Sequence, residues 1–242
     1  MKKFLLSFLV TINIYSQSSD IFTPLDVFDL EYVSNTEISP DGNKILYQRN
    51  FNDIMTDESF SNIWLINFDG SENRPITTGN FKDTSPKWSN KGDKFVFKSN
   101  REGKSQIFLF DLTNNSIQKL TNFQYSISSI KWSPDDSYIL FSSFIDDKRD
   151  KLIKMPEKPK GAKWNDPPVE ISDLNYRYDG SGYRKPGETQ FFTLPVTGGT
   201  PRQISNIPAE KRAFQGEWID KNTIVFSANL NEDSDYNTIN TE

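Results

Sequence analysis

The chain has 242 residues, of which 35% are hydrophobic, enough to bury a sizeable core in one large all-β domain or two ordinary domains. It carries 28 Lys and Arg against 33 Asp and Glu, a formal net charge of −5, and the charges are scattered along the sequence. Nucleic-acid binding needs a basic patch, so we expect no nucleic-acid partner.

The sequence contains neither cysteine nor histidine. Without cysteine it forms no disulfide and no thiolate metal site. Without histidine it lacks the commonest general base and holds no Ser-His-Asp triad. The string Asp179-Gly180-Ser181-Gly182 lacks the spacing of a G-x-S-x-G nucleophile turn, and the pair Asp146-Asp147 lacks the spacing of a Ca²⁺ loop. We therefore expect no catalytic residue, metal site or cofactor in this chain.

Residues 1–17 have the pattern of a secretory signal peptide. Lys2 and Lys3 precede an apolar stretch from Phe4 to Tyr15, followed by small polar residues. The stretch is well short of the roughly 20 residues that a membrane-spanning helix needs. Cleavage near Ser16 or Gln17 predicts a secreted or periplasmic protein without membrane contact. A buried N-terminal helix or a retained anchor is the alternative.

One pattern recurs four times, as ISPDGNKILYQ from Ile38, WSNKGDKFVFKS from Trp88, WSPDDSYILFSS from Trp132 and WIDKNTIVFSA from Trp218. Polar pairs such as Asp135-Asp136 are typical of hairpin tips, so we interpret them as turns rather than chemical sites. The apolar runs that follow do not alternate with polar residues, which favours strands covered on both faces by stacked sheets. The three tryptophans are expected in the sheet cores, near the starts of innermost strands.

A second hairpin follows three of the four copies, with turns at Asp69-Gly70, Asn114-Asn115 and Gly198-Gly199. Two hairpins make four antiparallel strands, the content of one propeller blade. The sequence therefore predicts an all-β fold, an incomplete β-propeller of about three and a half blades within residues 21–230. The blades are expected at about 32–78, 84–121, 127–205 and 213–230, before a truncated polar tail at 231–242.

The third repeat contains an insertion at 146–187. Ten positions separate Phe97 from Ile107 in the second repeat, whereas fifty separate Phe141 from Phe191 in the third. The insertion joins the second and third strands of the third blade, so we expect it on the face that carries the links between blades. Aromatic residues and arginine on a loop favour a contact surface. The candidates for substrate docking are Tyr176, Arg177, Tyr178, Asp179, Tyr183 and Arg184. The alternative is a hairpin whose tyrosines fold back onto the blade.

Several segments between about Ile21 and Ala228 carry a resemblance to a known family: TPLDVFDLEYVSNTEISPDGNKILYQRN, SNREGKSQIFLFDL, LNYRYDGSGY and LPVTGGTPRQIS. They resemble the N-terminal propeller of the prolyl oligopeptidase family, above all its acylaminoacyl-peptidase and dipeptidyl-peptidase-like secreted members. In that family a propeller of seven or eight blades precedes an α/β-hydrolase domain with Ser, Asp and His, and it admits peptides rather than folded proteins.

The resemblance implies the substrate-gating portion of a secreted serine-type oligopeptidase or aminopeptidase, truncated before the hydrolase domain and not catalytic as given. Its partner would be a peptide substrate that reaches the absent domain. The alternative is a periplasmic, non-enzymatic interaction propeller of the Tol-system type, because Tol propellers share the repeat.

Overall fold

The computed structural model describes residues 22–147, 156–165, 168–171, 173–208, 211–234 and 236. The predicted signal peptide at 1–17 and most of the polar tail lie outside these residues. In the described part of the chain, one short 3₁₀ helix, η1 (Pro24–Phe28), precedes a succession of β-strands. The described part includes no helix that is both long and apolar enough to cross a membrane.

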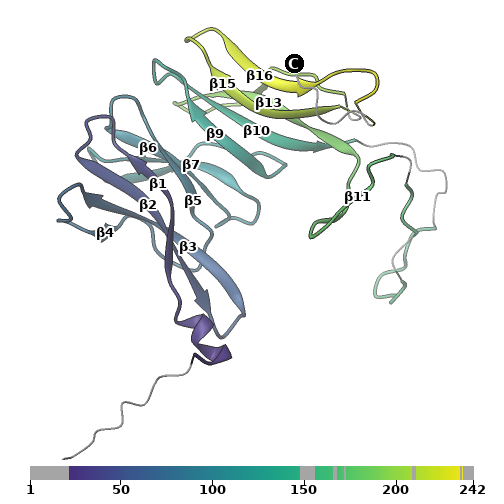
Figure 1. The fold of residues 1–242 in the computed structure, drawn as a ribbon, viewed down its shortest axis with the longest axis horizontal. Helices are drawn as coiled ribbons and strands as arrows, with labels where there is room; N and C mark the ends of the chain where they lie inside the picture. Colours follow the sequence, from purple (N-terminus) through teal and green to yellow (C-terminus); the bar gives the residue numbers. More distant parts are fainter. Residues whose placement is uncertain are drawn as a thin grey trace, which may run out of the picture.

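Three four-stranded antiparallel sheets follow one another along the chain, and a two-stranded sheet follows them (Figure 1). The first comprises β1 (Tyr32–Ile38), β2 (Lys44–Asp53), β3 (Glu58–Asn67) and β4 (Arg74–Pro75); the second β5 (Thr84–Trp88), β6 (Lys94–Ser99), β7 (Gln106–Asp111) and β8 (Ser116–Lys119). The third comprises β9 (Ile127–Trp132), β10 (Tyr138–Asp146), β13 (Gly187–Pro195) and β14 (Arg202–Gln203); the fourth β15 (Arg212–Trp218) and β16 (Ile224–Asn229). The predicted incomplete propeller is confirmed, since the described sheets form separate blades and no closed ring.

Apolar side chains between neighbouring blades form the core. On β6, Phe95 and Phe97 face the first blade and pack with Leu46, whereas Val96 between them packs with Phe141 of the third blade. Each of these side chains is at most 2% exposed. Because successive side chains of a strand point to opposite faces, a strand between two other blades must be apolar at every position. The expected double coverage is confirmed for β6 and β10, where each buried side chain contributes about 1.5–3 kcal/mol. It is not found in the fourth blade, where Val225 is 50% exposed.

An amide side chain at the start of β7 ties the second blade to its outgoing connector. The Oε1 atom of Gln106 accepts hydrogen bonds from the backbone N–H of Phe123, at 2.7 Å, and from the hydroxyl of Thr121, at 2.8 Å. Its Nε2 donates to the carbonyl of Phe123 at 2.9 Å, and the N–H of Ile107 donates to Thr121 Oγ1 at 2.9 Å. We call this set of bonds the connector clamp. It fixes where the chain leaves one blade for the next.

The connector clamp recurs in the other two complete blades. In the third blade the same four contacts are made, at identical sequence separations, by Gln190, Phe191, Ser205 and Ile207. In the first blade Asn62 Nδ2 donates to the carbonyl of Gly79, and the N–H of Ile63 donates to Thr77 Oγ1. The shorter Asn62 thus preserves part of the clamp, and all three connectors are held by a side chain of their own third strand.

The tryptophans lie at the ends of the first strands of their blades. The prediction that they lie near the starts of the innermost strands is therefore wrong. Trp88 closes β5, Trp132 closes β9 and Trp218 closes β15. The error arose because the polar first strands that precede these residues show no hydrophobic pattern. Trp88 is 8% exposed, and Trp132 and Trp218 are partly buried against the cores. The indole N–H groups of Trp88 and Trp132 donate to carbonyls of the preceding blade, those of Glu37 at 3.1 Å and Lys87 at 2.8 Å.

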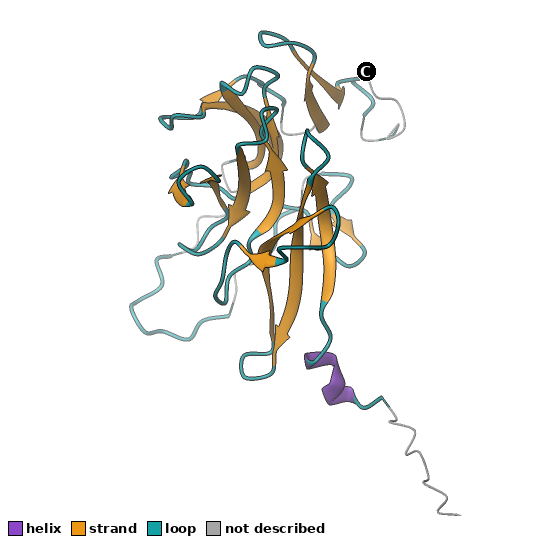
Figure 2. Ribbon diagram, turned by 90° about the vertical axis from the view of Figure 1, so that its left-hand side faces the viewer, coloured by secondary structure: helices purple, strands orange, loops and turns teal. Residues whose placement is uncertain are grey.

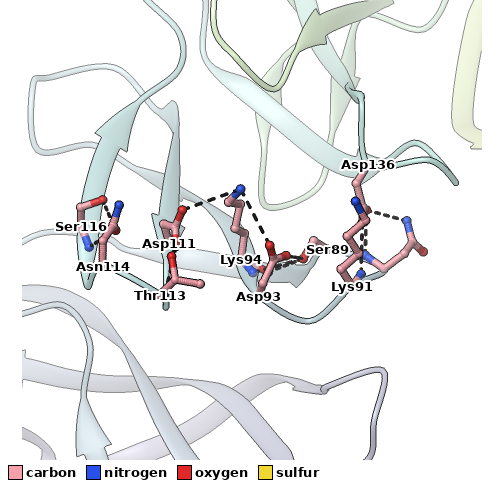
Figure 3. A network of polar contacts seen from close by, with 10 residues as sticks. Ser89, Lys91, Asp93, Lys94, Asp111, Thr113, Asn114, Ser116 and Asp136 are labelled. Carbon is pink, nitrogen blue, oxygen red and sulfur yellow. Dashed lines mark hydrogen bonds and ion pairs between the residues drawn. The ribbon is translucent and has the colours of Figure 1, made fainter.

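The polar pairs of the repeat occupy hairpin tips, as predicted. In the second blade Ser89, at the start of the tip, hydrogen-bonds Asp93, and Lys94 lies between the carboxylates of Asp93 and Asp111 (Figure 3). In the first blade Gly42 has a φ of 75°, a conformation that glycine adopts without a steric penalty. These side chains stabilise the turns through local hydrogen bonds and ion pairs.

Asp136 at the third tip holds the position of Gly42 and keeps a positive φ of 58°. Its carboxylate accepts the backbone N–H groups of Asn90, at 2.7 Å, and Lys91, at 3.1 Å, in the tip of the second blade (Figure 3). Aspartate is one of the few residues that tolerate this conformation. Aspartate at this position, in place of the glycine of the first blade, therefore adds hydrogen bonds between the second and third blades.

Replacing Gln106 by Met tests the connector clamp. The variant removes the amide but keeps the side-chain length, leaving the N–H and carbonyl of Phe123 without their partner, and we expect a loss of about 2 kcal/mol in the free energy of unfolding. The exposed Gln118 of β8 is the matched control, and its change to Met should cost under about 0.5 kcal/mol. Urea unfolding measures both. Equal values for the two variants would contradict the clamp.

The pKa of Asp41 provides a second test. Hydrogen bonds from the Ser39 hydroxyl, then from the backbone and side chain of Asn43, lower the pKa of this carboxyl from 3.8 to about 2. Since the folded pKa is the lower one, the stabilisation is present above pH 3.8 and is lost as the pH falls through about 2. NMR titration should locate the low pKa, and Asp41→Asn should flatten the acid dependence of stability in this window. Titration of Asp41 near 3.8 would contradict the turn geometry.

Candidate functional site

The connections between second and third strands leave the propeller on one face, together with the links between blades. The start of β3 shows this arrangement, because the N–H of Ser61 bonds the carbonyl of Phe81 in the first link and its carbonyl accepts the N–H of Asp83. We call this the connection face. Figure 1 shows η1 and the hairpin of β11 extending from the same side of the sheets. The insertion therefore lies on the face on which we expected it.

The insertion contains a short two-stranded hairpin, β11 (Arg177–Tyr178) and β12 (Gly182–Tyr183). Gly180 and Gly182 have φ values of 77° and 73°, so glycine allows the tight turn between them. The rings of Tyr176 and Tyr183 stack with centroids 6.4 Å apart, and the N–H of Arg184 donates to the carbonyl of Tyr176 at 2.7 Å. A local stack and a local hydrogen bond thus give the hairpin its shape.

The structure separates the six docking candidates into two groups. Five of them, namely Tyr176, Arg177, Tyr178, Asp179 and Tyr183, have exposed side chains on the hairpin. The sixth, Arg184, turns back toward the blade, and its side chain is only 13% exposed. The three tyrosines are 41–56% exposed, so they are not folded into the blade core. A docking role for these residues remains a prediction.

Arg184 belongs to the root of the insertion. Its Nη2 lies 3.4 Å from Oε2 of Glu188, whose side chain is 8% exposed. Glu188 Oε1 in turn accepts the backbone N–H of Ala213, on the first strand of the fourth blade, at 3.5 Å. Just before Glu188, Gly187 has a φ of 143°, and a Cβ there would lie 2.3 Å from the carbonyl oxygen of Ile145. The root is therefore tightly packed, whereas the hairpin beyond it is exposed.

The described part of the insertion encloses a small cavity. Its volume is about 20 Å³, and it lies between residues 169–171 and Asp173 on one side and Tyr176 and Tyr183 on the other. That volume holds about one water molecule. The hairpin can therefore offer a surface to a ligand, but it does not form a pocket that encloses a peptide side chain.

Charged residues recur near the ends of the first strands. Glu37, Lys87, Lys131 and Glu217 each precede the last residue of their strand. Lys87 pairs with Glu37 between the first two blades, and Lys131 pairs with Glu217 between the last two. Exposed pairs of this kind contribute about 0–1 kcal/mol each. They join neighbouring blades, and the four residues together carry no net charge.

Two features were missed by the sequence reasoning. The connector clamp has a sequence signal, a Gln or Asn before the apolar run of the third strand and a Thr or Ser about 15 residues later, as in Gln106 and Thr121. The second feature is a groove of about 440 Å³ between η1 and the β2–β3 hairpin. The groove has no sequence signal, because it depends on how η1, which precedes the first blade, packs against the β2–β3 hairpin within that blade.

Comparison with known proteins agrees with this architecture. The family model of the TolB beta propeller domain matches residues 32–161. The uncharacterized peptidase YuxL of Bacillus subtilis is 29% identical over 220 residues, which cover 89% of this chain and 32% of that protein. Dipeptidyl-peptidase 5 of Porphyromonas gingivalis is 27% identical over 130 residues, which cover 54% of this chain and 19% of that protein.

Among solved structures, the acylaminoacyl peptidase of Pyrococcus horikoshii superposes with a TM-score of 0.63 at 20% identity, over 83% of this chain and 28% of that one. At this identity the likeness establishes the fold. The chain spans about a third or less of the length of each of these relatives. The predicted resemblance to the propellers of peptidases is confirmed.

Replacing Gly187 by Ala tests the root of the insertion. The new Cβ would meet the Ile145 carbonyl, and we expect a loss of about 3 kcal/mol in the free energy of unfolding from the overlap and the positive φ together. Gly180 is the matched control, since it too has a positive φ but nothing within 4 Å of its added Cβ. Gly180→Ala should cost about 1 kcal/mol. Urea unfolding measures both, and a smaller loss at Gly187 would contradict the packed root.

Proposed function

The chain belongs to the TolB β-propeller domain family, and from this premise we propose that it is the substrate-gating propeller of an exported serine-type oligopeptidase or aminopeptidase of the prolyl oligopeptidase type. The observation that carries the proposal is the match to peptidase YuxL, which extends over 89% of this chain. The match includes the third blade with its insertion, beyond the part that the family model covers.

The geometry of the connection face supports this role. The enlarged connection between β10 and β13 projects there and offers exposed aromatic and charged groups, among them Tyr178 and Arg177. Aromatic and arginine side chains are the groups that most often dominate binding energy at contact surfaces. The firm root at Gly187 and Glu188 fixes where this surface stands relative to the blades.

In this proposal the chain selects the substrate and a catalytic domain outside it cleaves the peptide. The chain contains no histidine, so the proton transfers of a serine hydrolase need groups outside it. What this chain contributes is steric selection, because a rigid propeller across an active site admits extended peptides and rejects folded proteins. The insertion would then bind the part of the peptide that lies away from the scissile bond, which orients the substrate without taking part in the chemistry.

The second candidate is a propeller of the Tol-system type that binds a protein partner and catalyses nothing. The match of the TolB domain family to residues 32–161 favours it. The two candidates differ in one property of the intact protein. A serine peptidase is labelled by a fluorophosphonate probe and cleaves short peptides, whereas an interaction propeller does neither and instead retains an envelope protein in affinity capture.

Replacing Tyr178 by Ala in the intact protein tests the docking role. We expect the ratio of kcat/KM values for two peptides that differ beyond the scissile bond to change about fivefold, equivalent to about 1 kcal/mol of lost contact. The thermal midpoint should stay within about 2 °C of the unsubstituted protein, because the side chain is exposed.

Tyr138 provides the matched control, since it is 42% exposed against 41% for Tyr178 and lies at the opposite end of β10 from the insertion. Tyr138→Ala should leave the ratio unchanged. Equal changes of the ratio in the two variants, or a loss of stability parallel to the change in Tyr178→Ala, would refute docking at the hairpin. Absence of both fluorophosphonate labelling and peptide cleavage would refute the peptidase assignment itself.

A further inference from the structure

A groove of about 440 Å³ opens on the connection face at the first blade, far from the insertion in the sequence. One wall is the segment around η1 and the other is the end of the β2–β3 hairpin, and Figure 2 shows η1 beside the ends of these strands. Asn52 joins the walls, because its Nδ2 donates to the carbonyl of Val27 at 2.9 Å while Ser59 Oγ donates to its Oδ1 at 2.8 Å. The Asn52 side chain thus ties the two walls of the groove together.

Each wall of the groove carries apolar side chains among polar ones. They include Leu25 and Phe28 on the side of η1 and Phe51 and Ile54 on the side of the hairpin. Leu25 is 64% exposed and Ile54 is 57% exposed, although both are large aliphatic side chains. Covering such side chains is worth about 1.5–3 kcal/mol each. The volume also lies in the range of about 300–1,000 Å³ that is usual for ligand sites.

The charges of the groove all have one sign. Asp26, Asp29 and Asp53 line it, and none of the described lining residues is basic. Asp26 accepts the N–H of Thr23, and Asp53 accepts that of Met55, so both are partly used by the local backbone. The backbone N–H of Asp29 donates to the carbonyl of Asp26 at 3.1 Å, whereas its carboxylate makes no hydrogen bond or ion pair among the described residues. Its carboxylate is available to a ligand.

The two walls of the groove contain few cationic residues to balance these carboxylates. Residues 22–60 contain eight Asp and Glu but only Lys44 and Arg49 as cations. Arg49 pairs with Glu31, and Lys44 begins β2 at the end that lies away from the groove. A groove lined by both apolar side chains and carboxylates is complementary to a ligand that combines apolar surface with positive charge.

The ligand must carry its positive charge on an organic group. No group of three or more carboxylates in the described residues is arranged to hold a metal ion, so a bare cation does not account for the groove. We propose that the groove binds a polypeptide segment in which apolar side chains alternate with lysine or arginine. The apolar side chains cover Leu25 and Ile54, and the cationic ones lie against Asp29 and its neighbours. The binding does not depend on whether the chain serves a peptidase.

Fluorescence anisotropy with three labelled nonapeptides tests the proposal on the purified full chain: alternating Leu and Lys, alternating Leu and Glu, and alternating Ser and Lys. We expect the Leu–Lys peptide to bind, and each of the other two to bind about tenfold more weakly, because one adds like charge and the other lacks apolar surface. Binding of the Leu–Lys peptide should also weaken as NaCl is raised. Equal binding of the Leu–Lys and Leu–Glu peptides would overturn the proposal.

Matched variants then locate the site. Asp29→Asn should weaken Leu–Lys binding about fivefold, the effect of one unscreened contact of unit charges in water, while Asp57→Asn, outside the groove, should not change it. Leu25→Ser should weaken binding about tenfold, while Leu30→Ser, equally outside the groove, should have no effect. All four side chains are exposed, so circular dichroism should show a fold like that of the unsubstituted chain.

Two results would show that the groove is not a binding site for the peptide. If Asp29→Asn and Asp57→Asn weaken binding equally, the peptide responds to the net charge of the chain and not to the groove. If the chain elutes as a dimer in size-exclusion chromatography and Leu25→Ser makes it monomeric, a second copy covers the groove. Either result refutes the proposal and leaves the peptidase assignment untouched, because that assignment rests on probe labelling and peptide cleavage by the intact protein.

Discussion

The connector clamp is the interaction on which the rest of the structure depends. An apolar core alone would let neighbouring sheets slide, because hydrophobic contact has no preferred direction. The amide of Gln106 removes that freedom by binding both backbone groups of Phe123 in the outgoing connector. Gln190 does the same for the third blade. The point at which the chain leaves the second and third blades is therefore fixed, and the face that carries the connectors becomes a defined surface.

That rigidity lets the connection face vary without loss of the fold. The connection after β2 is a tight hairpin beside η1, whereas the one after β10 extends over about forty residues. Both leave from strands whose apolar side chains are already buried between blades, so their lengths have little effect on the core. A surface that can change while its support stays constant is suited to binding functions. The exposed tyrosines and the acidic groove both occur there, on different blades.

The opposite face of the propeller carries the hairpin tips, which local hydrogen bonds stabilise. Its hairpin tips consist of short-range bonds between hydroxyl, carboxylate and backbone groups, as at Ser39 and Asp41. Asp136 goes further and binds the tip of the preceding blade. Hydrogen bonds from Ser39 to Asp41 and from Ser133 to Asp135, together with backbone N–H groups, lower the pKa of these two tip carboxyls. A pair of aspartates in the sequence therefore marks a turn, although it looks like a chemical site.

The sequence by itself determined the propeller, because strands buried on both faces must be apolar throughout, and runs such as KFVF between turn residues express that constraint locally. It also indicated the insertion, since the distance between Phe141 and Phe191 breaks the period. Only the tertiary structure decided that Arg184 belongs to the root and not to the exposed hairpin, that the tryptophans end their strands, and that η1 and Asn52 form a groove. The groove depends on a contact between segments 25 residues apart, Asn52 with Val27, and such contacts leave no periodic pattern in the residues that make them. The direction of the Arg184 side chain and the ends of the first strands likewise have no periodic signal.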